Sequence, residues 1–290
     1  MLSVGAFVMF SGIVALLWGP RLAAAEGASP RTYYVAVGAS ESIGYQPTPA
    51  APRGAPTREG YANDLVTMER PRWAGLHLVQ YGCAGITAEG ALDGHERCHY
   101  PAGSEIATAV RFVDAHRART VLITVDLGFN DIWPCLIHHT VDGLCVNSAL
   151  DVVGRVLPRI VTELHRAARP GALIVGLQHP DPYLGDYLRG GGNRAFARSS
   201  ISVFHRFNAE LATVYSDNGA LVADVPAAYR TADVAPAYLA GHGSVPTSVA
   251  QVCTLTWMCT LHNVHPNAAG YQTIAAAIAE AIQTAPITPT

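Results

Sequence analysis

A run of aromatic and β-branched residues at positions 33–37 ends abruptly at small residues, and this junction limits the folds open to the chain. The run predicts a buried strand. Gly38 and Ala39 then predict a tight turn that leaves Ser40 at the carboxyl end of the strand, where open α/β sheets hold their ligands. A serine there is placed to act as a nucleophile if a base reaches it. The alternative is that Ser40 or Ser42 only caps the next helix.

Four further buried runs alternate with helical patterns along the rest of the chain. Strands are predicted at residues 76–81, 120–127, 172–177 and 220–225, and helices at residues 60–68, 104–117, 148–169 and 195–215 and again after residue 267. Such alternation is typical of βαβ units, in which a mostly parallel sheet is covered by helices on both faces. The sequence therefore predicts a three-layer α/β/α sandwich with a mostly parallel five-stranded sheet.

The amino terminus has the pattern of a signal peptide. Residues 4–18 are apolar, and Ala23-Ala24-Ala25 follows as a small-residue cleavage site. The apolar run is short for a membrane span, although the absence of Arg before it leaves an uncleaved anchor as an alternative. We expect a leader at residues 1–25 and one catalytic domain at residues 26–290, because no linker or change of composition divides the rest. We therefore expect a secreted, extracellular protein.

Six cysteines fit an exported chain. They fall into three groups close in sequence, namely Cys83 with Cys98, Cys135 with Cys145, and Cys253 with Cys259. Fifteen pairings are possible in principle, and the grouping favours three short disulfide loops. A zinc site is the alternative, but no C-x-x-C spacing occurs and no histidines stand at ligand spacing around the cysteines. Free thiols would be expected only if the chain stayed in the cytosol.

The charged residues exclude several functions. The formal net charge is −3, and all 19 basic residues are Arg, because the chain contains no Lys. Lysine nucleophiles and Schiff bases are therefore excluded. The basic residues are scattered and form no stripe that predicts nucleic-acid binding. No metal-ligand set is recognisable in the sequence, so we expect no metal and no cofactor.

Small or polar residues follow three of the predicted strands, namely Ser40, Gly85 and Asn130. Because parallel strands end at one edge of a sheet, these residues are expected to converge. Acyl transfer needs a nucleophile, donors for the developing oxyanion and a base. Ser40 is the candidate nucleophile, the main-chain N–H groups of Ser40 and Gly85 with the Asn130 amide are the candidate donors, and His265 is the candidate base.

Each of these residues also has a purely structural explanation. Gly85 is explained equally by a turn that needs a positive φ angle. Asn130 is explained by a turn or a helix cap. His265 is one of twelve histidines, and a single histidine before a helix usually has no function. Only their joint placement favours a catalytic site.

Four segments resemble the sequence blocks of the SGNH hydrolases, the GDSL-type esterases and lipases. These segments are G-A-S-E-S at residues 38–42, Gly85, G-F-N-D at residues 128–131 and V-H-P-N at residues 264–267, in the order found in that family. Further segments, such as T-W-M-C at residues 256–259, resemble a secreted actinobacterial subgroup with three sequential disulfides. The resemblance implies the fold and the roles assigned above, with Ser40 as nucleophile, Gly85 and Asn130 as donors and His265 as base.

Two departures from the family pattern concern its aspartates. Ala39 stands where the first block usually has Asp. The acid that normally stands three residues before the base is replaced by His262. In the subgroup that this chain resembles, a main-chain carbonyl can replace the acid, so we expect the carbonyl of His262 to accept from Nδ1 of His265. The alternative is a distant carboxylate, with Asp224, Asp233 and Asp181 as candidates.

The sequence thus predicts a monomeric secreted serine esterase or lipase that acts on a small-molecule or lipid ester, with no nucleic-acid partner. The same residues also suit an O-acetyl-glycan esterase or an acyltransferase. A catalytically dead binding protein is the alternative from another class, suggested by the two missing aspartates. The loops at residues 46–59, 179–193 and 226–248 are expected to form the substrate pocket, and loops of this kind vary freely on one scaffold.

Overall fold

Five parallel strands form the central sheet of the protein, which was studied as a computed structural model describing residues 1–2, 31–94 and 97–285. The strands are β1 (Thr32–Gly38), β4 (Leu76–Gln80), β5 (Thr120–Asp126), β6 (Leu173–Leu177) and β7 (Leu221–Ala223). Their order in the sheet is β4-β1-β5-β6-β7, and every neighbouring pair is parallel. The prediction of five strands is confirmed, and the expected leader lies, apart from its first two residues, outside the described residues.

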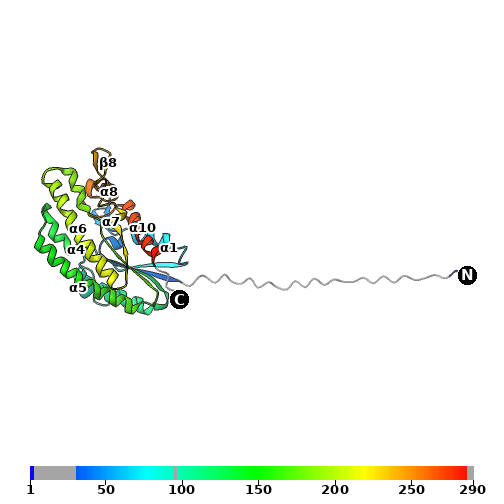
Figure 1. Cartoon of the computed structure of the whole chain (residues 1–290). Helices are drawn as coiled ribbons and strands as arrows, with labels where there is room; N and C mark the ends of the chain where they lie inside the picture. Colours follow the sequence, from blue (N-terminus) through cyan, green and yellow to red (C-terminus); the bar gives the residue numbers. More distant parts are fainter. Residues whose placement is uncertain (3–30, 95–96, 286–290) are drawn as a thin grey trace.

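Helices cover both faces of the sheet because side chains alternate along each strand. In β1, Val35 and Val37 join the core under α2 (Ala88–Asp93), α3 (Glu105–Ala115), α5 (Gly143–Ala167) and α6 (Gly191–Asp217). Tyr34 and Ala36 point to the other face, under α1 (Tyr61–Glu69) and α10 (Ala268–Thr284). Figure 1 shows the green and yellow-green helices α5 and α6 on one side and the red α10 with α1 on the other. The three-layer α/β/α fold is therefore confirmed.

Two helices begin earlier than their sequence patterns predicted. The α5 helix begins after Asp142, whose carboxylate accepts from the main-chain N–H groups of Leu144 and Cys145, each at 3.0 Å. Ser148, the predicted cap, lies inside this helix. The α6 helix begins at Gly191, within the glycine run that was predicted to be loop. Both errors have one cause, which is that the apolar stripe starts only where a helix reaches the core.

The three expected loops contain regular structure of their own. Residues 46–59 include an antiparallel hairpin of β2 (Gln46–Thr48) and β3 (Ala51–Ala55). A second hairpin joins β8 (Pro236–Leu239) to β9 (Gly243–Pro246), and η4 (Pro182–Arg189) is a 3₁₀ helix. The remaining short elements are η1 (Glu41–Ile43), η2 (Arg117–Arg119), α4 (Phe129–Ile132), η3 (Trp133–His139), α7 (Val225–Ala228), α8 (Thr247–Leu255) and α9 (Met258–Leu261).

Three disulfides join the cysteines that are close in sequence. They are Cys83–Cys98, Cys135–Cys145 and Cys253–Cys259, as predicted. The first two bonds attach the segments that follow β4 and β5, and the third joins α8 to α9 ahead of His265.

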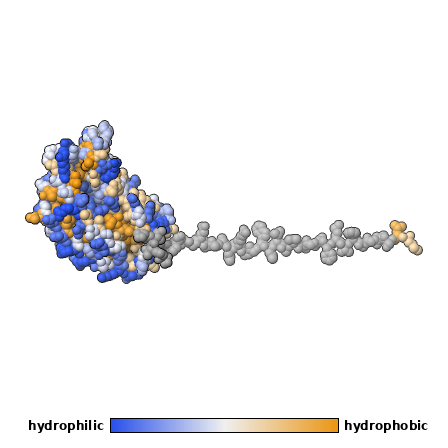
Figure 2. Space-filling view, viewed as in Figure 1, coloured by the Kyte–Doolittle hydropathy of each residue, from blue (hydrophilic) through white to orange (hydrophobic). Residues whose placement is uncertain are grey.

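The outer surface is mixed in polarity. Figure 2 shows hydrophilic and hydrophobic side chains interspersed on the face that Figure 1 presents. Among the described residues, none of the helices combines the length and the apolar character that crossing a bilayer requires.

Candidate active site

Ser40 lies on a tight turn at the carboxyl end of β1. Gly38 has φ +150°, and a Cβ on it would meet the carbonyl oxygen of Asp126 at 2.4 Å, so only glycine fits beside β5. The N–H of Ala39 donates to the same carbonyl at 2.8 Å. Ser40 makes no side-chain cap to η1, while the Ser42 hydroxyl donates back to the carbonyl of Ala39 at 2.7 Å. The capping explanation of Ser40 is therefore not supported.

The four candidate residues line one pocket. Ser40, Gly85, Asn130 and His265 all border a cavity of about 310 Å³. Its other lining residues come from several loops and are Tyr45, Arg53, Ala84, Arg97, Phe129, Trp133, His262, Asn263 and Val264. The convergence of the strand ends expected from the parallel sheet is thus observed. Of the three loops predicted to build the pocket, only that at residues 46–59 contributes to this lining.

Two hydrogen bonds hold the Gly85 loop against α4. The amide Nδ2 of Asn130 donates to the carbonyl of Ile86 at 3.0 Å, and the Asp131 carboxylate accepts from the N–H of Ala88 at 3.0 Å. Gly85 itself has φ +83°, and the Cys83–Cys98 disulfide attaches the start of its loop. Burial raises the pKa of Asp131 to about 6. Since an amide nitrogen has two hydrogens, Asn130 keeps one for the pocket.

The acceptor at His265 differs from the one predicted. Nδ1 of His265 lies 2.7 Å from Oδ1 of Asn263, and the same oxygen accepts from the main-chain N–H of His265 at 3.0 Å. The carbonyl of His262, which was predicted to fill this role, is not the hydrogen-bond partner. The reason is local, because an Asn side chain readily bonds the N–H two residues ahead, and the imidazole then meets the amide oxygen first.

The orientation of the Asn263 amide is determined at both ends. Its Nδ2 donates to the carbonyl of Arg53 in β3 at 3.3 Å, while Oδ1 faces the two donors of His265. An acceptor at Nδ1 leaves Nε2 of His265 free to take a proton. The sequence offered a weak signal for this contact, namely an Asn two residues before the candidate base.

Several contacts hold the loop that contains His265. The N–H of Trp257 donates to the carbonyl of His265 at 3.0 Å, and the Trp257 indole donates to Gln46 at 3.2 Å. The ring of Tyr45 lies 4.9 Å from the imidazole, centroid to centroid. Burial lowers the pKa of His265, and the charge of Glu41 opposes this shift only in part. The surroundings of His265 therefore favour the neutral form of its imidazole.

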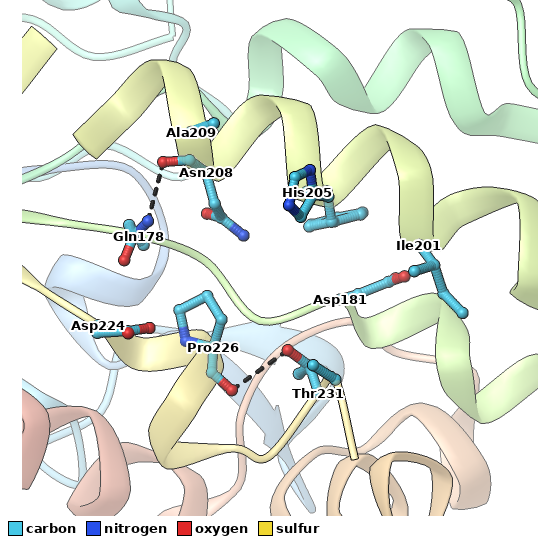
Figure 3. A pocket seen from close by; sticks show the side chains of 11 residues that line it. Gln178, Asp181, Ile201, His205, Asn208, Ala209, Asp224, Pro226 and Thr231 are labelled. Carbon is cyan, nitrogen blue, oxygen red and sulfur yellow. Dashed lines mark hydrogen bonds between the residues drawn. The ribbon is translucent and has the colours of Figure 1, made fainter. Parts of the chain in front are cut away.

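The three distant carboxylates considered as triad acids are engaged elsewhere. Asp181 accepts from the hydroxyl of Ser200 at 2.7 Å, Asp224 caps α7 through the N–H of Ala227, and Asp233 pairs with Arg230. Figure 3 shows Asp181 and Asp224 at a second pocket, which shares no lining residue with the pocket of Ser40. None of the three is a hydrogen-bond partner of His265 in the described part of the chain.

A buried polar cluster that the sequence did not reveal lies beside the turn of Ser40. Nδ1 of His179 is 3.6 Å from Oε2 of Glu41, and its Nε2 is 3.6 Å from Oδ1 of Asp126. Burial lowers the pKa of His179, but the two carboxylates outweigh burial and leave it above the usual value. Burial and Glu41 raise the pKa of Asp126. The sequence offered one indication of this cluster, namely that Asp126 is a carboxylate in a strand that is otherwise mostly apolar and was predicted to be buried.

Glu105 is a further buried acid that the sequence did not reveal. It accepts from the N–H of Gly38 at 2.5 Å and lies near the hydroxyl of Tyr100. Its side chain is fully buried, and burial raises its pKa well above the usual value. Glu105 therefore supports the last peptide of β1 before the turn and does not face the pocket.

A serine, a histidine and an amide at one pocket on a parallel sheet is an arrangement typical of serine-dependent ester hydrolases. The family model of the GDSL-like lipase/acylhydrolase family matches residues 36–273. The chain belongs to this family, and its reaction class is the hydrolysis of carboxylic esters. A comparison with curated protein sequences finds no match.

Solved structures with the same fold include two lipases and a phospholipase. Phospholipase A1 from Streptomyces albidoflavus is 18% identical over 86% of this chain and 99% of its own, with a TM-score of 0.51. The extracellular lipase from Streptomyces rimosus is 17% identical over 86% and 99%, with a TM-score of 0.50. A lipase from a goat rumen metagenome is 15% identical over 86% and 97%, with a TM-score of 0.52. At these identities the similarity establishes the fold alone.

Proposed function

We propose that the protein is a secreted serine esterase that forms an acyl-enzyme on Ser40, with His265 as the general base. The observation that carries this proposal is the meeting of Ser40, Gly85, Asn130 and His265 at one pocket, although they come from four separate segments of the chain. Family membership supports the reaction class. We assign these residues to one catalytic domain at residues 26–290.

In the proposed mechanism, Nε2 of His265 takes the hydroxyl proton as Ser40 attacks the ester carbonyl. The developing oxyanion accepts from the N–H groups of Ser40 and Gly85 and from the Asn130 amide. The imidazolium then returns its proton to the leaving alcohol, and water attacks the acyl-enzyme by the same route in reverse. All atoms and charges balance with water as the only co-reactant.

Asn263 is the proposed positioning residue for this base. An amide that replaces the triad acid is costly, by about 10⁴-fold in kcat, when its N–H₂ group faces the imidazole and imposes the wrong tautomer. Here Oδ1 faces Nδ1 and the nitrogen is engaged by the Arg53 carbonyl, so the productive tautomer is the one favoured. Only the charge stabilisation of an aspartate is missing, and the Glu41 carboxylate acts on His265 in the same direction from a greater distance.

The size of the pocket supports a short acyl group. A cavity of about 310 Å³ stands at the small end of the range for ligand pockets, which is roughly 300–1,000 Å³. We expect acetyl and butyryl esters to be hydrolysed with higher kcat/KM than palmitoyl esters. A chain-length series of p-nitrophenyl esters measures this directly, and a maximum at long chains would assign the protein to the lipases in the narrow sense.

Secretion is supported by the three disulfides, which persist in oxidising compartments. We propose that residues 1–25 are removed on export and that the mature enzyme is a monomer that needs no cofactor. Expression of the full chain in an exporting host, followed by N-terminal sequencing of the protein in the medium, tests the cleavage site. Retention of the whole chain in the membrane fraction would instead favour an uncleaved anchor.

The decisive test of the catalytic assignment is labelling with a fluorophosphonate probe. Wild type should be labelled at Ser40, and Ser40→Ala should lose both labelling and ester hydrolysis. Ser42→Ala is the matched control, because Ser42 lies two residues away and its hydroxyl donates to the carbonyl of Ala39. Activity of Ser40→Ala within tenfold of wild type would overturn the mechanism. Absence of labelling in folded wild type would favour a binding protein, and acyl transfer to an added alcohol or glycan would favour a transferase.

A further inference from the structure

The pocket of Ser40 is bordered by two arginines and, among the described residues, by no acidic side chain. Arg53 belongs to β3 of the hairpin over the pocket, and Arg97 belongs to the segment just before Cys98. The proposed reaction uses neither guanidinium. The lining of this pocket therefore carries positive charge, although the net charge of the whole chain is −3.

The acidic side chains closest in sequence to the catalytic residues are engaged elsewhere. Glu41 directly follows Ser40, and its carboxylate faces Nδ1 of His179 at 3.6 Å. The carboxylate of Asp131 in α4 accepts from the main-chain N–H of Ala88 at 3.0 Å. Neither Glu41 nor Asp131 borders the cavity. Within the described residues, the wall of the pocket thus offers an arginine no carboxylate to pair with.

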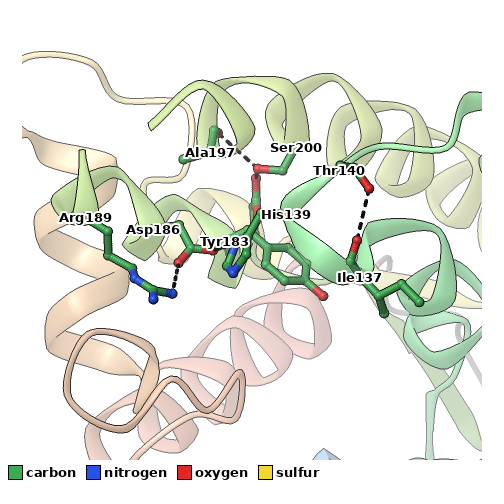
Figure 4. A network of polar contacts seen from close by, with 9 residues as sticks. Ile137, His139, Thr140, Tyr183, Asp186, Arg189, Ala197 and Ser200 are labelled. Carbon is green, nitrogen blue, oxygen red and sulfur yellow. Dashed lines mark hydrogen bonds and ion pairs between the residues drawn. The ribbon is translucent and has the colours of Figure 1, made fainter. Parts of the chain in front are cut away.

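Arg53 differs from the arginines that form ion pairs. Arg189, for example, lies 3.5 Å from a carboxylate oxygen of Asp186, and Figure 4 shows this pair. Arg53 forms no such pair with any described carboxylate. Its main chain is held beside the base, because its carbonyl accepts from Nδ2 of Asn263 at 3.3 Å. The exposed guanidinium of Arg53 therefore starts next to the base and keeps its N–H donors for a ligand.

Arg97 lies against the loop of a proposed oxyanion donor. A Cβ on Gly85 would come within 2.9 Å of Nη1 of Arg97, so the guanidinium rests where this glycine has no side chain. The neighbouring Cys98 is bonded to Cys83, which is at the start of the same loop, and this disulfide holds Arg97 beside it. One guanidinium thus stands near an oxyanion donor, and that of Arg53 belongs to the strand that holds the amide beside the base.

We propose that the enzyme selects esters that carry a carboxylate on their acyl or alcohol part, bound by Arg53 or Arg97. This inference rests on the ester hydrolysis at Ser40 proposed above. A guanidinium matches a carboxylate with two parallel N–H···O bonds, which a neutral ester of the same length cannot accept. A pocket lined by positive charge also attracts anions from solution. Because the two arginines come from different loops, each part of the ester is tested separately.

Two matched pairs of esters test the proposal with wild type. Monoethyl glutarate is compared with ethyl pentanoate, in which a methyl group replaces the carboxylate of the acyl part. The pair of 4-acetoxybutanoate and butyl acetate makes the same comparison on the alcohol part. Hydrolysis of all four is followed by base consumption at constant pH. We expect at least one charged ester to have a kcat/KM about fivefold above that of its neutral partner, and added NaCl to reduce this ratio.

Variants show whether the two arginines cause the preference. The ratio of the charged to the neutral ester should fall towards one in Arg53→Gln, in Arg97→Gln or in the double variant. Arg198→Gln is the matched control, because it removes a positive charge from an exposed position of α6 outside the pocket, and it should keep the wild-type ratio. A ratio within one enzyme is independent of how much of that enzyme is folded.

Each outcome decides the proposal. Equal kcat/KM within both pairs for wild type would overturn it and leave the esterase function intact. A preference that survives in the double variant would overturn the assignment to Arg53 and Arg97. If folded wild type hydrolyses none of the four esters, the proposed function fails and this inference fails with it. The wild-type ratios and their salt dependence remain decisive if a variant does not fold.

Discussion

Two histidines near the same turn have opposite surroundings. His265 borders the pocket, meets a neutral amide at Nδ1, and has its pKa lowered by burial. His179 lies beneath the turn, faces a carboxylate at each ring nitrogen, and has its pKa raised by them. Glu41, Asp126 and His179 are not among the residues that line the pocket of His265. A base that must start neutral is oriented by an acceptor that adds no charge, whereas the charged cluster serves the framework.

The largest expected effect separates the two histidines by function. His265→Ala should lower kcat on the order of 10⁴- to 10⁶-fold, because the general base is removed while the fold remains. His179→Gln should lower Tm and reduce kcat far less, because its side chain does not border the pocket. Ester hydrolysis and thermal unfolding of both variants measure this. Losses of kcat of equal size would show that the two histidines act as one unit.

The next effect concerns the amide that orients the base. Asn263→Ala should lower kcat by about 10²- to 10⁴-fold with KM nearly constant, because Nδ1 loses the acceptor that selects the tautomer. Asn263→Asp is the control and should keep substantial activity, since a carboxylate also accepts at Nδ1. If Asn263→Ala behaves like wild type, the His262 carbonyl or another acceptor orients His265 in solution.

The oxyanion site is expected to show a smaller loss. Asn130→Ala should lower kcat by about 10²- to 10³-fold, the usual result of removing one donor. The same amide also holds the Gly85 loop through the Ile86 carbonyl, so Asn130→Ala is expected to lower stability as well as kcat. Thermal unfolding measures the loss of stability, and steady-state kinetics measures the loss of the oxyanion donor. A change in KM alone would indicate substrate binding instead of oxyanion stabilisation.

The pH dependence sharpens the contrast between the two histidines. Since burial lowers the pKa of His265 below its usual value of about 6.5, the base stays neutral as the pH falls to that point. The acid limb of kcat/KM should therefore fall only below about pH 6.5. In Asn263→Asp the added negative charge favours the imidazolium, so the limb should move to higher pH. A wild-type limb above pH 7 would contradict the neutral environment of His265.

The smallest expected effect is on stability. Replacing Cys253 and Cys259 with Ser should lower the free energy of unfolding by about 2 kcal/mol, because the loop that they close is short. This bond attaches the segment that leads to His265, so the catalytic loss should exceed that of the Cys135–Cys145 variant. Denaturant unfolding and kcat of the two variants measure this. Equal catalytic losses would show that Cys253–Cys259 has no special relation to the base.

The strands and the pocket residues could be predicted because their signals are local. A β-branched run that ends in small residues identifies β1 and the position of Ser40, and the parallel sheet then requires the strand ends to meet. Sequence-adjacent cysteines likewise paired as expected, since short loops restrict the choice of partner. The helix starts were less predictable, because the caps of α5 and α6 precede the apolar stripe.

Other features of the site were decided by the tertiary structure alone. Whether the His262 carbonyl or the Asn263 side chain meets His265 depends on main-chain angles and on the Arg53 carbonyl, which lies more than two hundred residues away in the sequence. The cluster of Glu41, Asp126 and His179 exists only because β1, β5 and β6 are neighbours. In the sequence each of the three is an ordinary polar residue, and only their proximity in the folded interior lets the two carboxylates raise the pKa of His179 against the effect of burial.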